Sequence, residues 1–429
     1  MEDFWILGIS RGHNAGVCLL KNGEIVFSIE EERLSRQKYD GSPFASMIKV
    51  LDYTDKIDYM FIAHTTTVKD AGKIEFTGDN MYTGMARKLG LIDQHINPVT
   101  HPQVIDVSNQ HHKLHAACSF YRSGFDNAVA LVIDGCGSAY DVSYGYDPQY
   151  RPSDLWEMQM WEVESILDCS YPAELKTLYK HSATKDTLMV HIDHEASSEY
   201  LGEEGTHLAV HSGSAGITKT YEAATKYAGF QEIEAGKTMG LFPYGKPNKN
   251  IPAFFNNMNG IMLSDRNVFT SFYPRGALVN AQAYSELNSN QDAEGDLSLL
   301  QNRRDFAYAA QKETHEQVLN LVLKAVEMSG KKQVVFSGGY ALNCVANYYL
   351  LEQLREKGIE LYVEPISNDG GTCIGAALLG FHMITQDSKK YNGRDIYLGM
   401  PRSYSSNEVI DVASKYNATI EDADDQRII

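Results

Sequence analysis

The sequence predicts an α/β protein with two hydrophobic cores, and three observations lead to this fold class. Residues 4–27 and 128–146 each contain a strand, a tight turn with glycine and a second strand. A short apolar strand at 334–336 breaks into Ser-Gly-Gly and continues into a helix. With 429 residues, of which 43% are hydrophobic, the chain is long enough to bury two substantial cores.

The first segment begins with the apolar run of residues 4–9, which predicts a buried strand. Small and polar residues follow at 10–16, and a second apolar run occupies 17–20. Asn22-Gly23 then separates two apolar runs. This pair predicts a hairpin, because both turn positions favour positive φ.

The second segment repeats the pattern, with a strand at 128–133, a turn at 134–138 and a strand at 140–146. Backbone N–H groups in such turns can converge on an anion. Two turns that face each other across a cleft would therefore hold the phosphate of a nucleotide. Each turn alone is equally typical of a plain hairpin. The candidate glycines are Gly12, Gly135 and Gly137.

The third glycine loop, at residues 337–339, joins a strand to a helix. Its glycines would let a flat ligand such as adenosine lie close to the backbone. Earlier in the chain, residues 306–328 carry apolar side chains at steps of three and four, which indicates a core helix.

A metal site is suggested by His111 and His115, which stand four residues apart. If this segment is helical, both imidazoles project from one face, as a divalent ion requires of two ligands on one element. Asp369, in a loop before a helix of small residues, could supply a third ligand. The histidines alone fit ordinary polar positions of a helix, and Asp369 alone fits an Asx turn or a helix N-cap.

Seven motifs then appear in a recognisable order. They are Ile6-Leu7-Gly8-Ile9 with His13-Asn14-Ala15, Glu30-Glu31-Glu32-Arg33, His111-His112-x-x-His115-Ala116-Ala117, Ile133-Asp134-Gly135, Gly236-Lys237-Thr238-Met239-Gly240-Leu241, Gly338-Gly339-x-Ala341-Leu342-Asn343 and Asp369-Gly370-Gly371. In this order the chain resembles the O-carbamoyltransferases related to nodulation protein U and tobramycin carbamoyltransferase. The resemblance extends over nearly the whole sequence.

The resemblance implies an actin-like (ASKHA) fold of two ribonuclease-H-like lobes with a central cleft, as in Kae1-like domains. Residues 1–125 would form the first lobe with the His pair, and 126–404 the second lobe with the adenosine-binding loop. A variable insertion is expected at about 150–205, where no clean periodicity is seen, near the cleft that would select the acceptor. Residues 405–429 would begin a linker toward a YrdC-like domain that this sequence lacks.

The resemblance also implies a reaction in two steps. A YrdC-like domain, in cis or in trans, makes carbamoyl-adenylate from carbamoyl phosphate and ATP. The present domain passes the carbamoyl group to a hydroxyl of a small molecule, such as a sugar, an antibiotic or a hydroxymethyl-pyrimidine nucleotide. The alternative class is an actin-like ATP-dependent kinase or ATPase, which would not need a His pair and a distant Asp. A non-catalytic binding module would keep the fold but lose His13 or Asp134, and both are present.

Roles for the site residues follow from the resemblance. A divalent transition metal would be held by His111, His115 and Asp369, with Fe(II) preferred and Mn(II) or Zn(II) as alternatives, because N/O ligation does not distinguish them. His13 would lie beside the reacting carbonyl, and Asp134 would orient or deprotonate the acceptor hydroxyl. Lys237 would offset negative charge, or be a surface lysine before a core strand. The adenosine would be cradled by Ser337, Gly338, Gly339 and Asn343.

Composition limits the partners and the compartment. A formal charge of −18 argues against duplex nucleic acid or an anionic membrane as a partner. Six cysteines without CxxC spacing predict reduced thiols of a cytoplasmic protein. No apolar run reaches membrane-spanning length, and no signal-like segment opens the chain. Homodimerisation is left open.

The C-terminal segment carries a capping box, Ser405-x-x-Glu408, that opens a predicted amphipathic helix. The sequence then ends on Ile428-Ile429 without a turn or polar tail. We expect one part of a longer enzyme, with a natural one-domain protein as the alternative.

Overall fold

The structure is a computed structural model. It describes residues 3–64, 81–96, 101–141, 159–183, 191–198, 203–212, 216–251, 254–257, 269–271, 297–390, 395–400 and 404–421.

The first sheet has five strands in the order β3-β2-β1-β4-β5. Its strands are β1 (Trp5–Ser10), β2 (Gly16–Lys21), β3 (Glu24–Glu30), β4 (Tyr59–Ala63) and β5 (Val104–Asp106). The first three are antiparallel neighbours, and β4 and β5 join in parallel. The predicted hairpin is confirmed, because Asn22 and Gly23 connect β2 to β3 with φ of 53° and 86°.

The second sheet has eight strands, in the order β10-β11-β9-β8-β6-β14-β15, with β7 paired to β8. Its strands are β6 (Asn127–Ile133), β7 (Ala139–Asp141), β8 (Gln159–Ser170), β9 (Glu174–Ala183), β10 (His191–Ser198), β11 (Glu203–Ser212), β14 (Gln333–Ser337) and β15 (Glu360–Val363). A separate ribbon pairs β12 (Phe255–Asn257) with β13 (Phe269–Ser271). The predicted step from strand through Ser-Gly-Gly into helix is confirmed at the end of β14.

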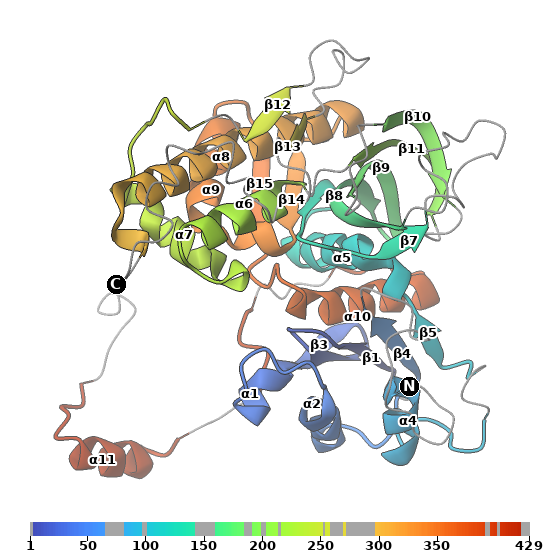
Figure 1. Cartoon of the computed structure of the whole chain (residues 1–429). Helices are drawn as coiled ribbons and strands as arrows, with labels where there is room; N and C mark the ends of the chain where they lie inside the picture. The colour runs from blue at the N-terminus through green and yellow to red at the C-terminus, as the bar shows by residue number, and fades with distance from the viewer. Residues whose placement is uncertain are drawn as a thin grey trace.

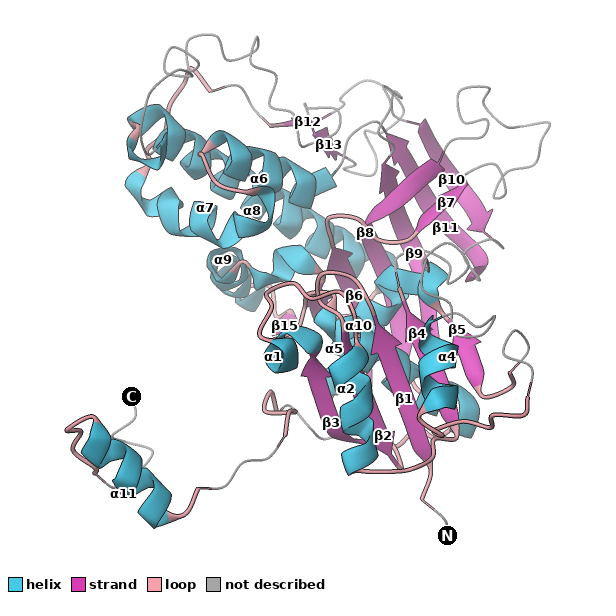
Figure 2. Ribbon diagram, turned by 60° about the horizontal axis from the view of Figure 1, so that its bottom comes forward, coloured by secondary structure: helices cyan, strands magenta, loops and turns pink. Residues whose placement is uncertain are grey.

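Helices lie between the two sheets and on their outer faces (Figures 1 and 2). Between the sheets, α5 (His111–Ser123) packs on β6, β8 and β14, and α10 (Gly370–Thr385) packs on β1, β2 and β4. The remaining helices are α1 (Glu31–Ser35), α2 (Phe44–Lys49) and α4 (Met81–Lys88) beside the first sheet, and α6 (Gly216–Tyr227), α7 (Ala235–Leu241), α8 (Gln301–Ser329) and α9 (Cys344–Arg355) beside the second.

Strand β1 shows how its sequence builds two of these layers. Ile6 belongs to the core between the sheets, whereas Leu7 and Ile9 belong to the core under α2 and α4. Successive side chains of a strand point to opposite faces, so a continuous apolar run fits a strand that is covered on both sides.

The boundary between the lobes that was expected at residue 125 does not separate the helices in the same way as the sheets. Helix α5 precedes that boundary but packs on the second sheet, and α10 follows it but packs on the first sheet. The two helices pack on each other so closely that a Cβ on Gly375 would stand 1.9 Å from the carbonyl oxygen of Leu114. Only glycine fits at this position of α10.

Residues 159–183 correct the expectation of an insertion at about 150–205. They form β8 and β9, two strands inside the second sheet. The periodicity was hidden because buried positions carry charges, as in the ion pair of Glu162 with Lys180 at 2.6 Å and that of Glu164 with His181. The rest of the expected insertion lies partly outside the described residues.

The second glycine turn also differs from the expected hairpin. Strands β6 and β7 do not pair with each other. Both pair with β8, one after the other along its length, and residues 134–138 form the turn between them. The predicted continuation of this strand beyond residue 141 lies outside the described residues.

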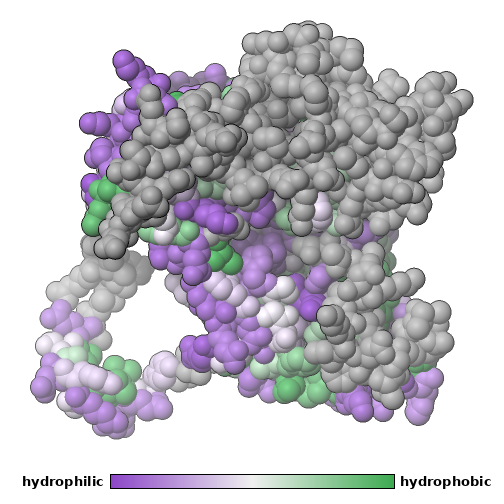
Figure 3. Space-filling model, viewed as in Figure 1, coloured by the Kyte–Doolittle hydropathy of each residue, from purple (hydrophilic) through white to green (hydrophobic). Residues whose placement is uncertain are grey.

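Helix α11 (Ser406–Lys415) begins with the predicted capping box between Ser405 and Glu408. None of its residues is buried, and hydrophobic side chains reach its surface, drawn green in Figure 3. Across the described residues, no helix combines the length and apolar character needed to span a membrane.

The contact between α5 and α10 predicts a sharp effect of one methyl group. Gly375→Ala should lower the free energy of unfolding by about 1–3 kcal/mol or more, because its Cβ meets backbone that cannot move aside. Gly240→Ala is the matched control. It lies in helix α7, and apart from the adjacent backbone of that helix nothing lies within 4 Å of its added Cβ, so the change should stabilise the helix by about 0.5–1 kcal/mol. Equal denaturant midpoints for the two variants would contradict this packing.

Candidate functional site

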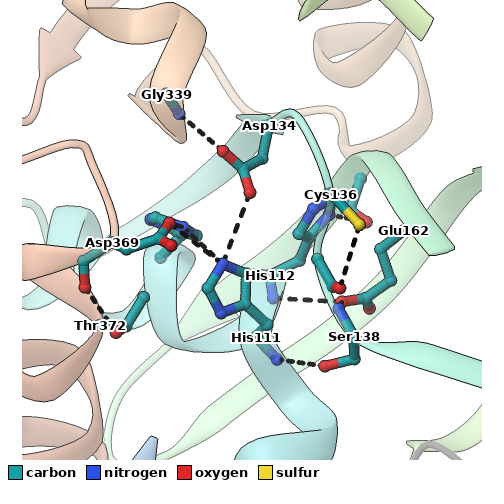
Figure 4. A network of polar contacts seen from close by, with 12 residues as sticks. His111, His112, Asp134, Cys136, Ser138, Glu162, Gly339, Asp369 and Thr372 are labelled. Atoms are coloured by element: carbon teal, nitrogen blue, oxygen red, sulfur yellow. Dashed lines mark hydrogen bonds and ion pairs between the residues drawn. The ribbon is translucent and has the colours of Figure 1, made fainter. Parts of the chain in front are cut away.

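Four ionisable side chains converge where the two lobes meet. They come from helix α5 (His111 and His115), the end of β6 (Asp134) and the start of α10 (Asp369), and one ligand atom of each lies within 4.8 Å of the others. The Nε2 atom of His111 is 3.1 Å from Nε2 of His115, 3.4 Å from Oδ1 of Asp369 and 3.5 Å from Oδ2 of Asp134. Figure 4 shows the two carboxylates directed toward His111.

Three of the four members of the cluster are held in place by backbone or hydroxyl contacts. The N–H of His111 donates to Oγ of Ser138 at 3.1 Å, and the hydroxyl of Ser337 donates to the carbonyl of His115 at 3.0 Å. The N–H of Gly339 donates to Oδ1 of Asp134 at 3.0 Å. The third glycine loop therefore holds both the helix of the His pair and the first of the carboxylates.

Asp369 stands at the N-cap position of α10, as its sequence context alone also predicts. Its side chain makes no cap hydrogen bond, and its Oδ1 instead lies 3.6 Å from Nε2 of His115. By contrast, His112 turns away from the cluster, and its Nδ1 lies 2.8 Å from Oγ of Ser165. Of the three histidines in this motif, two face the carboxylates.

The charges in the cluster are coupled. Burial opposes protonation of His111, but attraction to Asp369, with a hydrogen bond to Asp134, outweighs it and raises the pKa of His111 to about 10. Burial also opposes ionisation of the two carboxylates, yet the neighbouring imidazoles hold the pKa of Asp134 and of Asp369 below the usual range.

This donor set fits a divalent transition metal. Two imidazole nitrogens and two carboxylates converge from different elements, and both His rings and Asp134 are buried. Imidazole and carboxylate together suit Zn, Mn and Fe. Asp134, which the sequence suggested as a base, is thus within reach of the same ion as a fourth ligand.

A pocket of about 400 Å³ opens beside the cluster. Both lobes contribute to its lining. The residues from the first lobe are His13, Asn14 and Tyr39, and those from the start of α10 and the residue before it are Asn368 and Asp369. The remaining lining residues come from the turn after β6, from α6, from residues 233–239 and from the third glycine loop: Asp134, Gly135, Cys136, Thr218, Lys219, Tyr221, Glu222, Ile233, Ala235, Gly236, Met239, Gly339, Tyr340, Leu342 and Asn343. His13 is about half exposed, and its Nδ1 lies 3.8 Å from Oδ2 of Asp369.

Of the residues expected to bind nucleotide, Gly135, Gly339 and Asn343 line this pocket. Gly12, Gly137, Ser337 and Gly338 do not. The N–H of Gly137 already donates to the carbonyl of Glu162 at 2.8 Å, so this turn does not offer that group to a phosphate.

The other glycine-loop residues have structural contacts. Ser337 is buried and bonds to α5. Gly338 has a φ of 91°, and a Cβ there would lie 2.3 Å from the carbonyl oxygen of Ile133. Glycine is required here because β14 and β6 approach each other at this point.

Lys237 is not placed in the pocket. It lies in helix α7, not before a core strand, its side chain is 55% exposed, and its Nζ pairs with Oε1 of Glu234 at 2.6 Å. The expected neutralisation of charge in the pocket by Lys237 is therefore not supported.

Several residues of the site carry no motif that would have revealed them. Gln311, on helix α8, exchanges two hydrogen bonds of 3.1 Å with the amide of Asn343 and accepts one from the hydroxyl of Tyr221. Glu162 on β8 accepts the N–H of Ser138 at 3.0 Å and so holds the turn that carries Asp134. These residues lie far from the motifs along the sequence, so the sequence alone does not reveal their role.

Metal content tests the cluster. Purified protein should carry about one transition-metal ion per chain, and His111→Ala or Asp369→Ala should each lose it, because each removes a ligand from the site. His95→Ala, at an exposed position outside the cluster, should retain it. Elemental analysis that finds equal metal in all four proteins would exclude the assignment.

The affinity of the cluster for that metal should increase as the pH rises. In the metal-free protein the raised pKa of His111 keeps a proton on the ring, and this proton must leave before Nε2 can bind a cation. Both carboxylates are already ionised at neutral pH. From about pH 6 to about pH 8, the dissociation constant measured by competition with a chelator should fall about tenfold per pH unit. A constant that does not change with pH would argue against displacement of this proton.

Comparison with known proteins gives the family. A model of the carbamoyltransferase N-terminus family matches residues 5–97 and 71–378. An uncharacterized protein of Synechocystis sp. is 25% identical over 423 residues, which covers 92% of this chain and 60% of that protein. Nodulation protein NolNO of Sinorhizobium fredii is 24% identical over 405 residues, which covers 90% of this chain and 49% of NolNO. The chain thus spans about half to three fifths of these relatives.

Among solved structures, full-length HypF in its phosphate- and nucleotide-bound form is similar with a TM-score of 0.50 and 14% identity, over 89% of this chain and 56% of HypF. At this identity the likeness shows the fold, and it confirms the predicted actin-like arrangement of two ribonuclease-H-like lobes. The family match extends over most of the sequence and includes the His pair and Asp369. The chain belongs to the carbamoyltransferase N-terminus family.

Proposed function

We propose that this chain transfers a carbamoyl group from carbamoyl-adenylate to a hydroxyl of a small-molecule acceptor. The observation that carries the proposal is the cluster of two histidines and two aspartates, which opens onto the pocket between the lobes. A sugar kinase or ATPase of the same fold would not need this set of ligands, and the family match supports carbamoyl chemistry. Carbamoyl phosphate and ATP would be the substrates of the complete protein.

The adenosine of the donor would lie on the third glycine loop. Gly339 lets it approach the backbone, and the amide of Asn343 is already oriented by Gln311. A preoriented amide loses little conformational entropy when a ligand binds. The phosphate would then point toward the turn of Gly135, which lines the same pocket.

A divalent ion would be held by His111, His115 and Asp369, with Asp134 within reach as a further ligand. Fe(II) is our first choice, with Mn(II) and Zn(II) as alternatives. When bound, such an ion would supply Lewis-acid polarisation of the carbamoyl carbonyl or anchor the phosphate.

The chain's own residues would move the proton. The acceptor oxygen forms a bond to the carbamoyl carbon, the bond from that carbon to the phosphate oxygen breaks, and AMP leaves. The hydroxyl proton must go to a base, and His13 is the candidate because it lines the pocket, is half exposed and faces Asp369. Asp134 would orient the acceptor from the opposite lobe.

The partner that makes carbamoyl-adenylate would be a YrdC-like domain, in cis or in trans. The curated relatives are longer than this chain, which leaves room for such a domain in them. None of the six cysteines, all of them described residues, forms a disulfide, and four are buried, which suits a reducing compartment such as the cytoplasm.

The proposal is tested with preformed carbamoyl-adenylate and a panel of alcohols. His13→Asn should fold and bind adenine nucleotide, yet lower the single-turnover transfer rate by about a hundredfold, the usual scale for a positioned acid–base group. His95→Asn serves as a control at an exposed position. Mass spectrometry of the acceptor separates the classes, because a phosphoryl gain from ATP would identify a kinase. An unchanged rate would assign His13 a structural role.

A further inference from the structure

We propose that Lys219 binds the phosphate group of the adenylate in the pocket, an inference that rests on the proposed function. Among the described residues that line the pocket, Lys219 is the one lysine, and no arginine is present. The lining of the pocket also includes three carboxylates, those of Asp134, Glu222 and Asp369. Asp134 and Asp369 already face the imidazole of His111, so the cation that a phosphate can meet on the Glu222 side of the pocket is Lys219.

Lys219 lies in the first turns of helix α6, beside the turn that follows β6. Its Nζ would be 3.5 Å from a Cβ on Gly135, so the ammonium group stands against that turn. Gly135 adjoins Asp134, which accepts the N–H of Gly339 at 3.0 Å. The third glycine loop and the turn therefore meet, and a nucleotide with its adenosine on Asn343 would have its phosphate at the wall formed by Lys219.

The ammonium group is charged and has donors to offer. Its Nζ donates to Oε2 of Glu222 at 2.6 Å. An ammonium carries three N–H donors, so one contact with Glu222 leaves capacity for phosphate oxygens. Burial opposes this charge, but Glu222 outweighs it and raises the pKa of Lys219. The side chain is 31% exposed, so the group is reachable from the pocket.

Lys237 provides a natural comparison. It forms the same kind of pair three residues away from a glutamate, also at 2.6 Å, but it is 55% exposed and does not line the pocket. The two lysines thus form similar ion pairs, but only Lys219 lines the pocket. Substituting each in turn separates recognition in the pocket from a general effect of removing one positive charge.

The experiment compares AMP with adenosine, because the two ligands differ only in the phosphate. Calorimetric titration of the protein as purified should show that wild type prefers AMP. Lys219→Met should weaken AMP binding by about ten- to a hundredfold, the scale of a hydrogen bond between charged groups, and leave the affinity for adenosine unchanged. Lys237→Met should leave both affinities unchanged, and Lys219→Arg should restore most of the preference. Added salt should reduce the preference of wild type but not that of Lys219→Met.

Three results would overturn the inference. Equal loss of AMP and adenosine binding in Lys219→Met would mean a structural role. Unchanged AMP binding in that variant, or a wild type that does not prefer AMP, would remove the phosphate contact. A failure of the proposed function looks different, since wild type would then bind AMP through Lys219 but transfer no carbamoyl group from carbamoyl-adenylate.

Discussion

The close packing of α5 on α10 is the constraint on which the rest of the structure depends. Each helix is fixed to a different sheet, so their contact at Leu114 and Gly375 sets the position of one lobe against the other. The same contact brings the His pair on α5 within 3.4 and 3.6 Å of Asp369 at the start of α10. A change in helix spacing would therefore separate the ligands, and the cluster and the arrangement of the lobes are one feature.

Buried charges beside the start of α5 serve position more than stability. Burying an ion pair such as Glu162 with Lys180 gains little over a hydrophobic pair, because desolvation offsets the attraction. Glu162 instead orients the turn, because its carboxylate accepts the N–H of Ser138 and its backbone carbonyl accepts the N–H of Gly137. This explains why a turn that looks like a phosphate loop is used mainly to aim Asp134 at the histidines.

Much of the fold could be predicted where the signal is local. The hairpin at Asn22-Gly23, the Ser-Gly-Gly loop and the capping box at Ser405 each depend on neighbouring residues, and all are found. Strands β8 and β9 could not be predicted, because charged residues occupy some of their buried positions. The sheets on which α5 and α10 pack and the difference between Lys219 and Lys237 depend on tertiary packing, which similar local sequences do not reveal.

The central claim is that a metal ion sits where the two lobes meet. Anomalous diffraction from crystals of the purified protein, collected on both sides of the iron, manganese and zinc absorption edges, tests it most directly. The account predicts one strong peak in bonding contact with the Nε2 atoms of His111 and His115 and with the carboxylate of Asp369. A peak elsewhere, or none at this position with metal supplied in excess, would contradict it.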